Sequence, residues 1–231
     1  LCGKKKGAVL PVHADPNSNL NEVLGVDVEM TLGDIRENIA RADMANPSPI
    51  PAGMTKADYA DMMFGNALTE NDDFDMLVMG RTQGKGCYCY VNGILSAQVE
   101  KYAKNYRYVV VDNEAGLEHI SRGILPKVDM ILLVSDCSRR GIQAVGRINE
   151  MIQELNLGVK EVKLIVNRAP GGVLNDGVKE EIEKHGLILA GVVPQDETVY
   201  EYDAEGKPSV DVPEDAPIKQ AVLKIFKELG L

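Results

Sequence analysis

Short apolar runs alternate with amphipathic stretches along almost the whole chain, and this alternation restricts the folds it can adopt. Several runs are rich in Val, Ile and Leu and are apolar at both odd and even positions, as in strands covered on both faces. Strand–helix–strand repeats of this kind predict an α/β fold with a doubly wound, mostly parallel sheet and helices on both faces. Strands are expected at residues 9–12, 74–79, 108–112, 130–135, 162–167 and 187–193, and helices at residues 19–24, 32–40, 56–68, 91–106, 120–126, 140–155, 176–185 and 218–229.

Length and composition narrow the class of protein. A chain of 231 residues fits one α/β domain that spans residues 1–231. It carries 35 acidic and 25 basic residues, and the basic ones are scattered, so nucleic acid is not an expected partner. The chain has four cysteines, no secretory signal and no apolar stretch long enough to cross a bilayer. We therefore expect a cytoplasmic protein with reduced thiols, for which a membrane is not the favoured partner.

Polar residues and turn formers follow four of the expected strands. Along the chain they are Asp15; Asp112 and Gly116; Asn167 and Arg168; and Pro194, Gln195 and Asp196. In doubly wound sheets, ligands bind where the carboxyl ends of the strands enter loops. These residues are therefore the candidates for a ligand site.

Cys87 and Cys89 lie one residue apart in a glycine-rich stretch at residues 81–90. Two thiolates at this spacing can bind one soft metal ion, and the glycines let the backbone wrap around it. A tetrahedral site needs further ligands, which water, another part of the chain or a second copy of the chain could supply. A buried pair of small residues and a strained local disulfide are the alternatives, and the spacing alone does not separate them.

Two segments together carry a family resemblance. They are Gly-Cys-Tyr-Cys at residues 86–89 and Asp-Asn-Glu-Ala-Gly-Leu-Glu-His-Ile-Ser-Arg at residues 112–122. They resemble the MinD/ParA-type ATPases with a deviant Walker motif, and among them the CooC-type accessory ATPases that insert nickel into carbon monoxide dehydrogenase and acetyl-CoA synthase. The resemblance extends from residue 9 to residue 229. It implies a P-loop NTPase fold, ATP and Mg²⁺ as cofactors, and a homodimer with one of those nickel enzymes as its client.

The resemblance also assigns catalytic roles. Asp15 matches the switch I acid that orients the attacking water, Asp112 matches the acid that holds Mg²⁺ through water, and Gly116 matches the glycine that senses the γ-phosphate. These roles agree with the preference of Mg²⁺ for its own waters, one or two carboxylates and phosphate oxygens. His13 stands where many members of the family have another acid, so the handling of Mg²⁺ is expected to differ in detail.

Nucleotide binding is assigned to two later strand ends. Asn167, followed by Arg168, resembles the amide that reads the base. The turn formed by Pro194, Gln195 and Asp196 would lie along the adenine. Taken without the other segments, Asn167-Arg168 is better interpreted as a turn that ends a strand.

The cysteine pair matches the metal-binding pair of the CooC-type proteins. By the resemblance, Cys87 and Cys89 lie at a two-fold interface where two chains supply four thiolates. Such a site fits Zn²⁺ by its tetrahedral geometry and could hold Ni²⁺ in a square-planar form. The sequence does not choose between the two metals.

One family feature is missing from these 231 residues, namely the glycine-rich phosphate-binding loop that opens a helix. Residues 3–7 have the right composition but precede a strand, so they cannot present backbone N–H groups at a helix N-terminus. The chain also opens on Leu1 instead of Met. We therefore expect a fragment that lacks the first strand and the P-loop, and that does not hydrolyse ATP by itself.

Two other functions remain open. The first is a MinD/ParA-like positioning ATPase that binds a membrane or a partner protein. A basic amphipathic tail would indicate this function, and residues 217–231 have apolar positions at helical spacing beside Lys219, Lys224 and Lys227. The same stripe is normal for a terminal helix packed on a sheet, and this is the interpretation that we favour. A regulatory pseudo-ATPase that never had the loop is the third possibility.

Overall fold

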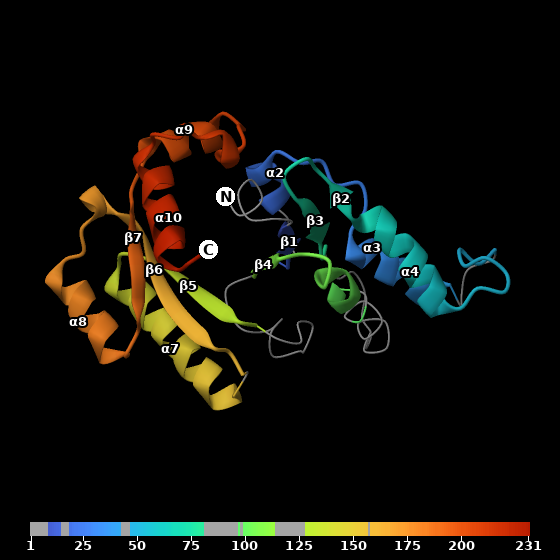
Figure 1. Cartoon of the computed structure of the whole chain (residues 1–231), viewed down its shortest axis with the longest axis horizontal. Coiled ribbons are helices and arrows are strands. Elements are labelled where there is room, and N and C mark those ends of the chain that lie inside the picture. The colour runs from blue at the N-terminus through green and yellow to red at the C-terminus, as the bar shows by residue number, and fades with distance from the viewer. Residues whose placement is uncertain are drawn as a thin grey trace. The chain divides into compact units, whose positions relative to one another are not determined.

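The computed structural model describes residues 9–14, 19–42, 47–80, 97, 99–113, 128–156 and 158–231. The chain divides into two compact units, Leu1–Pro126 and Lys127–Leu231. Each unit has its own parallel strands with helices packed against them (Figure 1). The single domain over residues 1–231 stays a prediction.

The first unit contains a four-stranded sheet in the order β2-β3-β1-β4. Strand β1 (Val9–His13) runs parallel to β3 (Asp75–Val78) on one side and to β4 (Tyr108–Asp112) on the other. The short edge strand β2 (Thr69–Glu70) pairs antiparallel with β3. Strand β1 therefore lies between two parallel neighbours.

The helices of the first unit begin at well-formed caps. Helices α3 (Leu32–Arg41) and α4 (Lys56–Ala67) each start with a capping box, in which a threonine side chain and an aspartate three residues later exchange hydrogen bonds with the backbone. The short helix α2 (Leu20–Leu24) follows β1. Such caps satisfy backbone N–H groups that have no partner within the helix.

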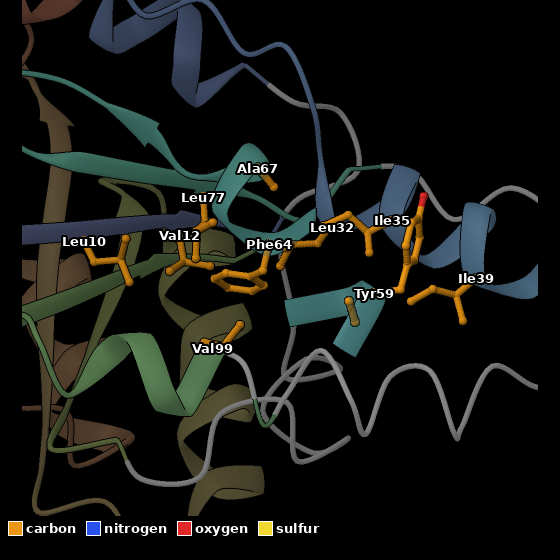
Figure 2. Packing of buried hydrophobic residues seen from close by; sticks show 11 residues of the cluster. Leu10, Val12, Leu32, Ile35, Ile39, Tyr59, Phe64, Ala67, Leu77 and Val99 are labelled. Atoms are coloured by element: carbon orange, nitrogen blue, oxygen red, sulfur yellow. The ribbon is translucent and has the colours of Figure 1, made fainter. Parts of the chain in front are cut away.

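A hydrophobic core joins these helices to the sheet. Figure 2 shows the ring of Phe64 from α4 beside Val12 of β1 and Leu77 of β3. Phe64 is fully buried, and its ring centroid lies 4.6 Å from that of Tyr102. The buried members of the cluster are Leu10, Val12, Leu32, Ile35, Ile39, Tyr59, Ala60, Phe64, Ala67, Leu77 and Val99.

The second unit contains a parallel sheet in the order β5-β6-β7. Its strands are β5 (Met130–Asp136), β6 (Glu161–Ala169) and β7 (Leu189–Pro194). In the central strand, Ile165 belongs to a cluster with Ile225, whereas the fully buried neighbours Leu164 and Val166 point to the opposite face. This sheet is therefore covered on both faces, as its apolar runs predict.

The described part of the second unit contains the helices α7 (Arg139–Leu155), α8 (Asp176–Lys184), α9 (Glu197–Ala204) and α10 (Pro217–Glu228). It also contains the 3₁₀ turns η1 (Pro170–Gly172) and η2 (Ser209–Asp211). Helix α10 packs on β7 so closely that a Cβ atom at Gly191 would lie 2.4 Å from a side-chain carbon of Ile225. The C-terminal amphipathic stretch therefore packs on its sheet, which confirms the favoured interpretation.

The described elements agree with the expected α/β fold and mostly parallel sheet. Strand β4 has the predicted bounds, and β6 is longer than expected because it continues to Ala169. Helix α9 was not expected. The helix predicted at 91–106 is described only in its second half, where residues 99–103 are helical, and the one predicted at 120–126 lies outside the described residues. None of the described helices is long and apolar enough to cross a membrane.

Candidate nucleotide site

The carboxyl ends of β1 and β4 meet at one edge of the first sheet. His13 and Asp112 are register partners, and the backbone N–H of Ala14 donates a hydrogen bond of 2.8 Å to the carbonyl of Asp112. The imidazole Nδ1 of His13 lies 3.3 Å from Oδ2 of Asp112. The two strand ends therefore bring the imidazole of His13 close to the carboxylate of Asp112.

Burial differs sharply between these two side chains. The side chain of His13 is completely buried, whereas that of Asp112 is 51% exposed. The second imidazole nitrogen, Nε2, accepts a hydrogen bond of 3.2 Å from the backbone N–H of Asn19, the residue before α2. The Asp112 carboxylate thus lies beside a buried imidazole and is open to solvent.

The end of β3 lies at the same edge. The carbonyl of His13 accepts a hydrogen bond from the N–H of Met79, and the carbonyl of Met79 accepts one from Gly33 in the first turn of α3, both at 2.8 Å. Gly80 has φ +70°, and a Cβ atom there would overlap the Thr31 side chain that caps α3. The start of α3 can reach the strand ends because residue 80 is a glycine.

The second sheet has its own polar edge at the ends of β5 and β6, where Asp136 and Asn167 are register partners. Oδ1 of Asp136 accepts hydrogen bonds from the hydroxyl (2.6 Å) and the N–H (2.9 Å) of Ser138, and these bonds lower the pKa of Asp136. Gly141 leaves room for this contact, since a Cβ atom there would lie 2.4 Å from Oδ1 of Asp136. Asp136 thus holds the first turn of α7 against the sheet.

The residues predicted to read the base come together at this edge. Oδ1 of Asn167 accepts a hydrogen bond of 2.8 Å from the N–H of Arg168, which has the left-handed φ of +55°. Ala169 is the register partner of Pro194, and its carbonyl accepts a hydrogen bond of 2.9 Å from Gln195. The two predicted segments, 167–168 and 194–195, are therefore neighbours in the structure.

Asp196 has a structural task. Its carboxylate accepts hydrogen bonds from the N–H groups of Thr198 (3.0 Å) and Ile218 (3.1 Å), at the starts of α9 and α10. The bond from Ile218 is the main cause of the lowered pKa of Asp196. The sequence signal for this role is an aspartate directly before a helix, which is a typical N-cap.

The comparisons with known proteins identify the family. The model of the CobQ/CobB/MinD/ParA nucleotide binding domain matches residues 1–210. The chain belongs to this family. It is 40% identical over 228 residues to an uncharacterised ATP-binding protein of Methanocaldococcus jannaschii, over 98% of this chain and 88% of that protein. It is 23% identical over 211 residues to the carbon monoxide dehydrogenase accessory protein CooC of Rhodospirillum rubrum, over 88% of this chain and 79% of CooC.

Solved structures support the MinD/ParA fold. MinD of Pyrococcus horikoshii, complexed with Mg-ADP, has a TM-score of 0.69 at 20% identity, with 98% of this chain and 85% of that one covered. A ParA family ATPase from Chlorobium tepidum has a TM-score of 0.70 at 17% identity, with 98% of this chain and 87% of that one covered. At this identity the likeness is one of fold.

Membership of the CobQ/CobB/MinD/ParA family implies ATP and Mg²⁺, and the first sheet offers a group that fits the ion. Mg²⁺ is a hard cation that prefers carboxylate oxygens and keeps several of its waters. Asp112 supplies a half-exposed carboxylate at the carboxyl end of a parallel strand, where a hydrated ion has room. The residue predicted to hold Mg²⁺ through water therefore has suitable chemistry and exposure.

Four predicted site residues lie outside the described residues, namely Asp15, Gly116, Cys87 and Cys89. Their roles, and the nickel or zinc site, stay predictions. Within the part of the chain that the structure describes, no group of three His, Cys, Asp or Glu side chains could hold a metal ion. Cys137, a free cysteine in the second unit, donates a hydrogen bond of 3.5 Å from its thiol to the carbonyl of Arg168.

Proposed function

We propose that the protein is a cytoplasmic, ATP-dependent metallochaperone that inserts nickel into carbon monoxide dehydrogenase or acetyl-CoA synthase. The observation that carries this proposal is the Cys87-Tyr88-Cys89 motif in a MinD/ParA-family chain that is also similar to a carbon monoxide dehydrogenase accessory protein. Membership of the family supports the binding of ATP. The cysteine pair supports the binding of nickel as the transported ion.

ATP hydrolysis uses the strand ends of the first unit. Asp112 would hold Mg²⁺ through its water shell, and Asp15, which follows β1 in the sequence, would orient the attacking water. Bound Mg²⁺ would neutralise charge on the transferring phosphoryl group. Gly116, close behind Asp112 in the sequence, leaves space for the backbone to respond to the γ-phosphate.

The residues that the family resemblance assigns to the nucleotide base belong to the second unit. Asn167, Arg168, Pro194 and Gln195 converge at the ends of β6 and β7, where they can contact adenine. Asp196 supports this turn from behind, because its carboxylate fixes the starts of α9 and α10.

Nickel is the cargo of the dimer. One chain supplies two thiolates from Cys87 and Cys89, and a symmetric pair of chains supplies four, which is enough for a complete site. Four sulfur ligands accept Zn²⁺ in a tetrahedral arrangement or Ni²⁺ in a square-planar one. ATP binding stabilises the dimer that forms this site, and hydrolysis releases the ion to the client enzyme.

A MinD/ParA-like positioning ATPase is the second candidate, since several of the solved neighbours are MinD and ParA proteins. Its membrane-binding form would need a free amphipathic tail. Helix α10 instead packs Ile218, Val222, Ile225 and Leu229 into a cluster with Ile165 and Val193. Helix α10 therefore does not supply such a tail.

Nickel transfer separates the two candidates. The full-length protein is loaded with Ni²⁺, mixed with nickel-free carbon monoxide dehydrogenase or acetyl-CoA synthase, and given ATP, and the recovered activity of the client is measured. The metallochaperone predicts ATP-dependent recovery that is lost in Cys87→Ser and kept in Cys137→Ser. An absence of ATP-dependent recovery with wild type would favour the positioning ATPase, and equal recovery with wild type and Cys87→Ser would exclude the cysteine pair from nickel transfer. A complete lack of ATP hydrolysis would favour a pseudo-ATPase.

A further inference from the structure

We propose that His13 is a positioning residue of the nucleotide site, which orients the Asp112 carboxylate through Nδ1 and tethers Asn19 through Nε2. The inference rests on the proposed role of Asp112 toward Mg²⁺. It assigns a task to a buried histidine that the function described so far does not use.

The hydrogen bond at Nε2 determines which tautomer the neutral ring adopts. Nε2 accepts the N–H of Asn19, so this nitrogen carries no proton. In a neutral imidazole the proton is then on Nδ1, which faces Oδ2 of Asp112 at 3.3 Å. His13 therefore presents a donor to the carboxylate and an acceptor to the backbone of Asn19.

The Nδ1 donor is buried and is not yet fully satisfied. Among the described residues it makes no hydrogen bond of good geometry, although Asp112 is within ion-pair distance. A buried polar group without a partner is costly, so this donor favours any rotation of the carboxylate that completes the bond. The Asp112 side chain is half exposed and has the freedom to rotate. Binding of nucleotide and ion would select this orientation.

The position of the ring is rigid because β1 lies between two parallel strands. His13 pairs with Val78 of β3 and with Asp112 of β4, and its carbonyl accepts the N–H of Met79. A ligand held by a group on a rigid strand is oriented more precisely than one held by a loop. In metal sites, residues that orient the ligand from behind are commonly worth about 10–100-fold in affinity.

The same ring also links two parts of the site. Asn19 closes the segment that follows β1, and Asp15 belongs to that segment. His13 therefore contacts Asn19 through Nε2 and faces the side chain of Asp112 with Nδ1.

Two substitutions separate the contacts of the two nitrogens. His13→Gln places an acceptor near Nε2 and removes the donor to Asp112, whereas His13→Asn keeps a donor near Nδ1 and loses the bond from Asn19. Mg²⁺ affinity is measured by titrating Mg²⁺ into full-length protein with fluorescent ATP. We expect His13→Gln to weaken Mg²⁺ binding about tenfold and His13→Asn to recover most of this loss. His185→Gln, in the second unit, is the matched control and should bind Mg²⁺ like the wild type.

A double-mutant cycle tests whether His13 acts through Asp112. In an Asp112→Asn background, His13→Gln should cause no further loss of Mg²⁺ affinity. Equal loss with and without the Asp112 carboxylate, or equal affinity in wild type and His13→Gln, would overturn the inference. Thermal unfolding of each variant identifies a loss that comes from misfolding.

Nitrogen-15 NMR of the imidazole rings tests the tautomer without any nucleotide. The His13 signals, identified by their absence in His13→Gln, should show that the neutral form of the ring carries its proton on Nδ1. A ring protonated at Nε2 would contradict the inference even if the protein binds Mg-ATP. A protein that shows the predicted tautomer but binds no Mg-ATP would instead contradict the proposed function.

Discussion

His13 and Asp112 face each other across the ends of two parallel strands, with Nδ1 of the imidazole 3.3 Å from Oδ2 of the carboxylate. The imidazole is fully buried and the carboxylate is half exposed. In such a pair the carboxylate lies beside a fixed group of the core, and its exposed side can meet a ligand. Asp112 is for this reason the described residue on which, in the proposed function, the binding of Mg²⁺ is expected to depend most.

Removing the charge of Asp112 should weaken the binding of Mg²⁺ with nucleotide. Asp112→Asn is expected to lower the apparent Mg²⁺ affinity about 10–100-fold, because an amide attracts the hydrated cation far less than a carboxylate. Mg²⁺ titrations in the presence of ATP measure this change. Asp129→Asn is the control, since Asp129 is an exposed residue paired with Lys160 on the second unit. Equal affinity in wild type and Asp112→Asn would exclude Asp112 from the ion site.

Asp15→Asn should separate binding from hydrolysis. If Asp15 orients the attacking water, the substitution should lower kcat about 100-fold or more and leave the Kd for Mg-ATP nearly unchanged. Single-turnover hydrolysis and equilibrium nucleotide binding measure the two quantities. Unchanged turnover would remove Asp15 from the mechanism.

Much of the fold could be predicted from local patterns. Strand β4 was predicted with its bounds because the apolar run Val109–Val111 ends at a charged residue, and α3 was predicted from its apolar periodicity after Thr31. Helix α9 was missed because Asp196 was interpreted as a ligand residue, although an aspartate before Glu197 and Thr198 is also a helix N-cap. The same aspartate thus fits both a ligand site and the start of a helix.

The contacts of the site were harder to predict because they depend on register. The sequence places Asp112 at a strand end, but the pairing of His13 with Asp112 exists only once β1 and β4 align. The burial of Glu181 likewise depends on how α7 packs against α8, which no spacing within α8 indicates. Local sequence patterns predict helices and strands, whereas contacts between residues far apart in the chain can be seen only in the folded structure.

Glu181 should make stability depend on pH. This carboxylate of α8 is 2% exposed and accepts hydrogen bonds from Arg139 (2.8 Å), Gln143 (3.2 Å) and Lys184 (3.2 Å), which together lower its pKa to about 2. Because the pKa is depressed in the folded state, the stabilisation is complete above the ordinary value of 4.5 and is lost as the pH falls toward 2.

The test compares melting temperatures of wild type and Glu181→Gln. Wild type should melt several degrees higher at about pH 7, and the difference should shrink steadily below about pH 4.5. Glu180→Gln, at the exposed neighbouring position, should follow the wild type. A difference in melting temperature that stays constant down to about pH 3 would show that the charge of Glu181 is not responsible.

Two glycines within helices allow a matched test of how tightly the helices are packed. A Cβ atom at Gly146 of α7 would lie 2.6 Å from ring atoms of His185, whereas one at Gly65 of α4 would meet nothing within 4 Å. Gly146→Ala should destabilise the protein by about 1–3 kcal/mol through steric overlap. Gly65→Ala should stabilise it by about 0.5–1 kcal/mol, because alanine favours the helix. Chemical denaturation measures both, and a stabilising Gly146→Ala would contradict the close contact with His185.

The number of metal ions per dimer tests the central claim most directly. If Cys87 and Cys89 of two chains share an ion, added Zn²⁺ or Ni²⁺ should shift full-length monomer to dimer, because an ion that binds only the paired state stabilises it by mass action. Analytical ultracentrifugation with metal analysis of the same fractions should give one ion per dimer. Cys87→Ser and Cys89→Ser should lose both the ion and the dimer, whereas Cys137→Ser should keep them. One tightly held ion per monomer, with no change in mass, would show that the site is completed within one chain and would contradict the account.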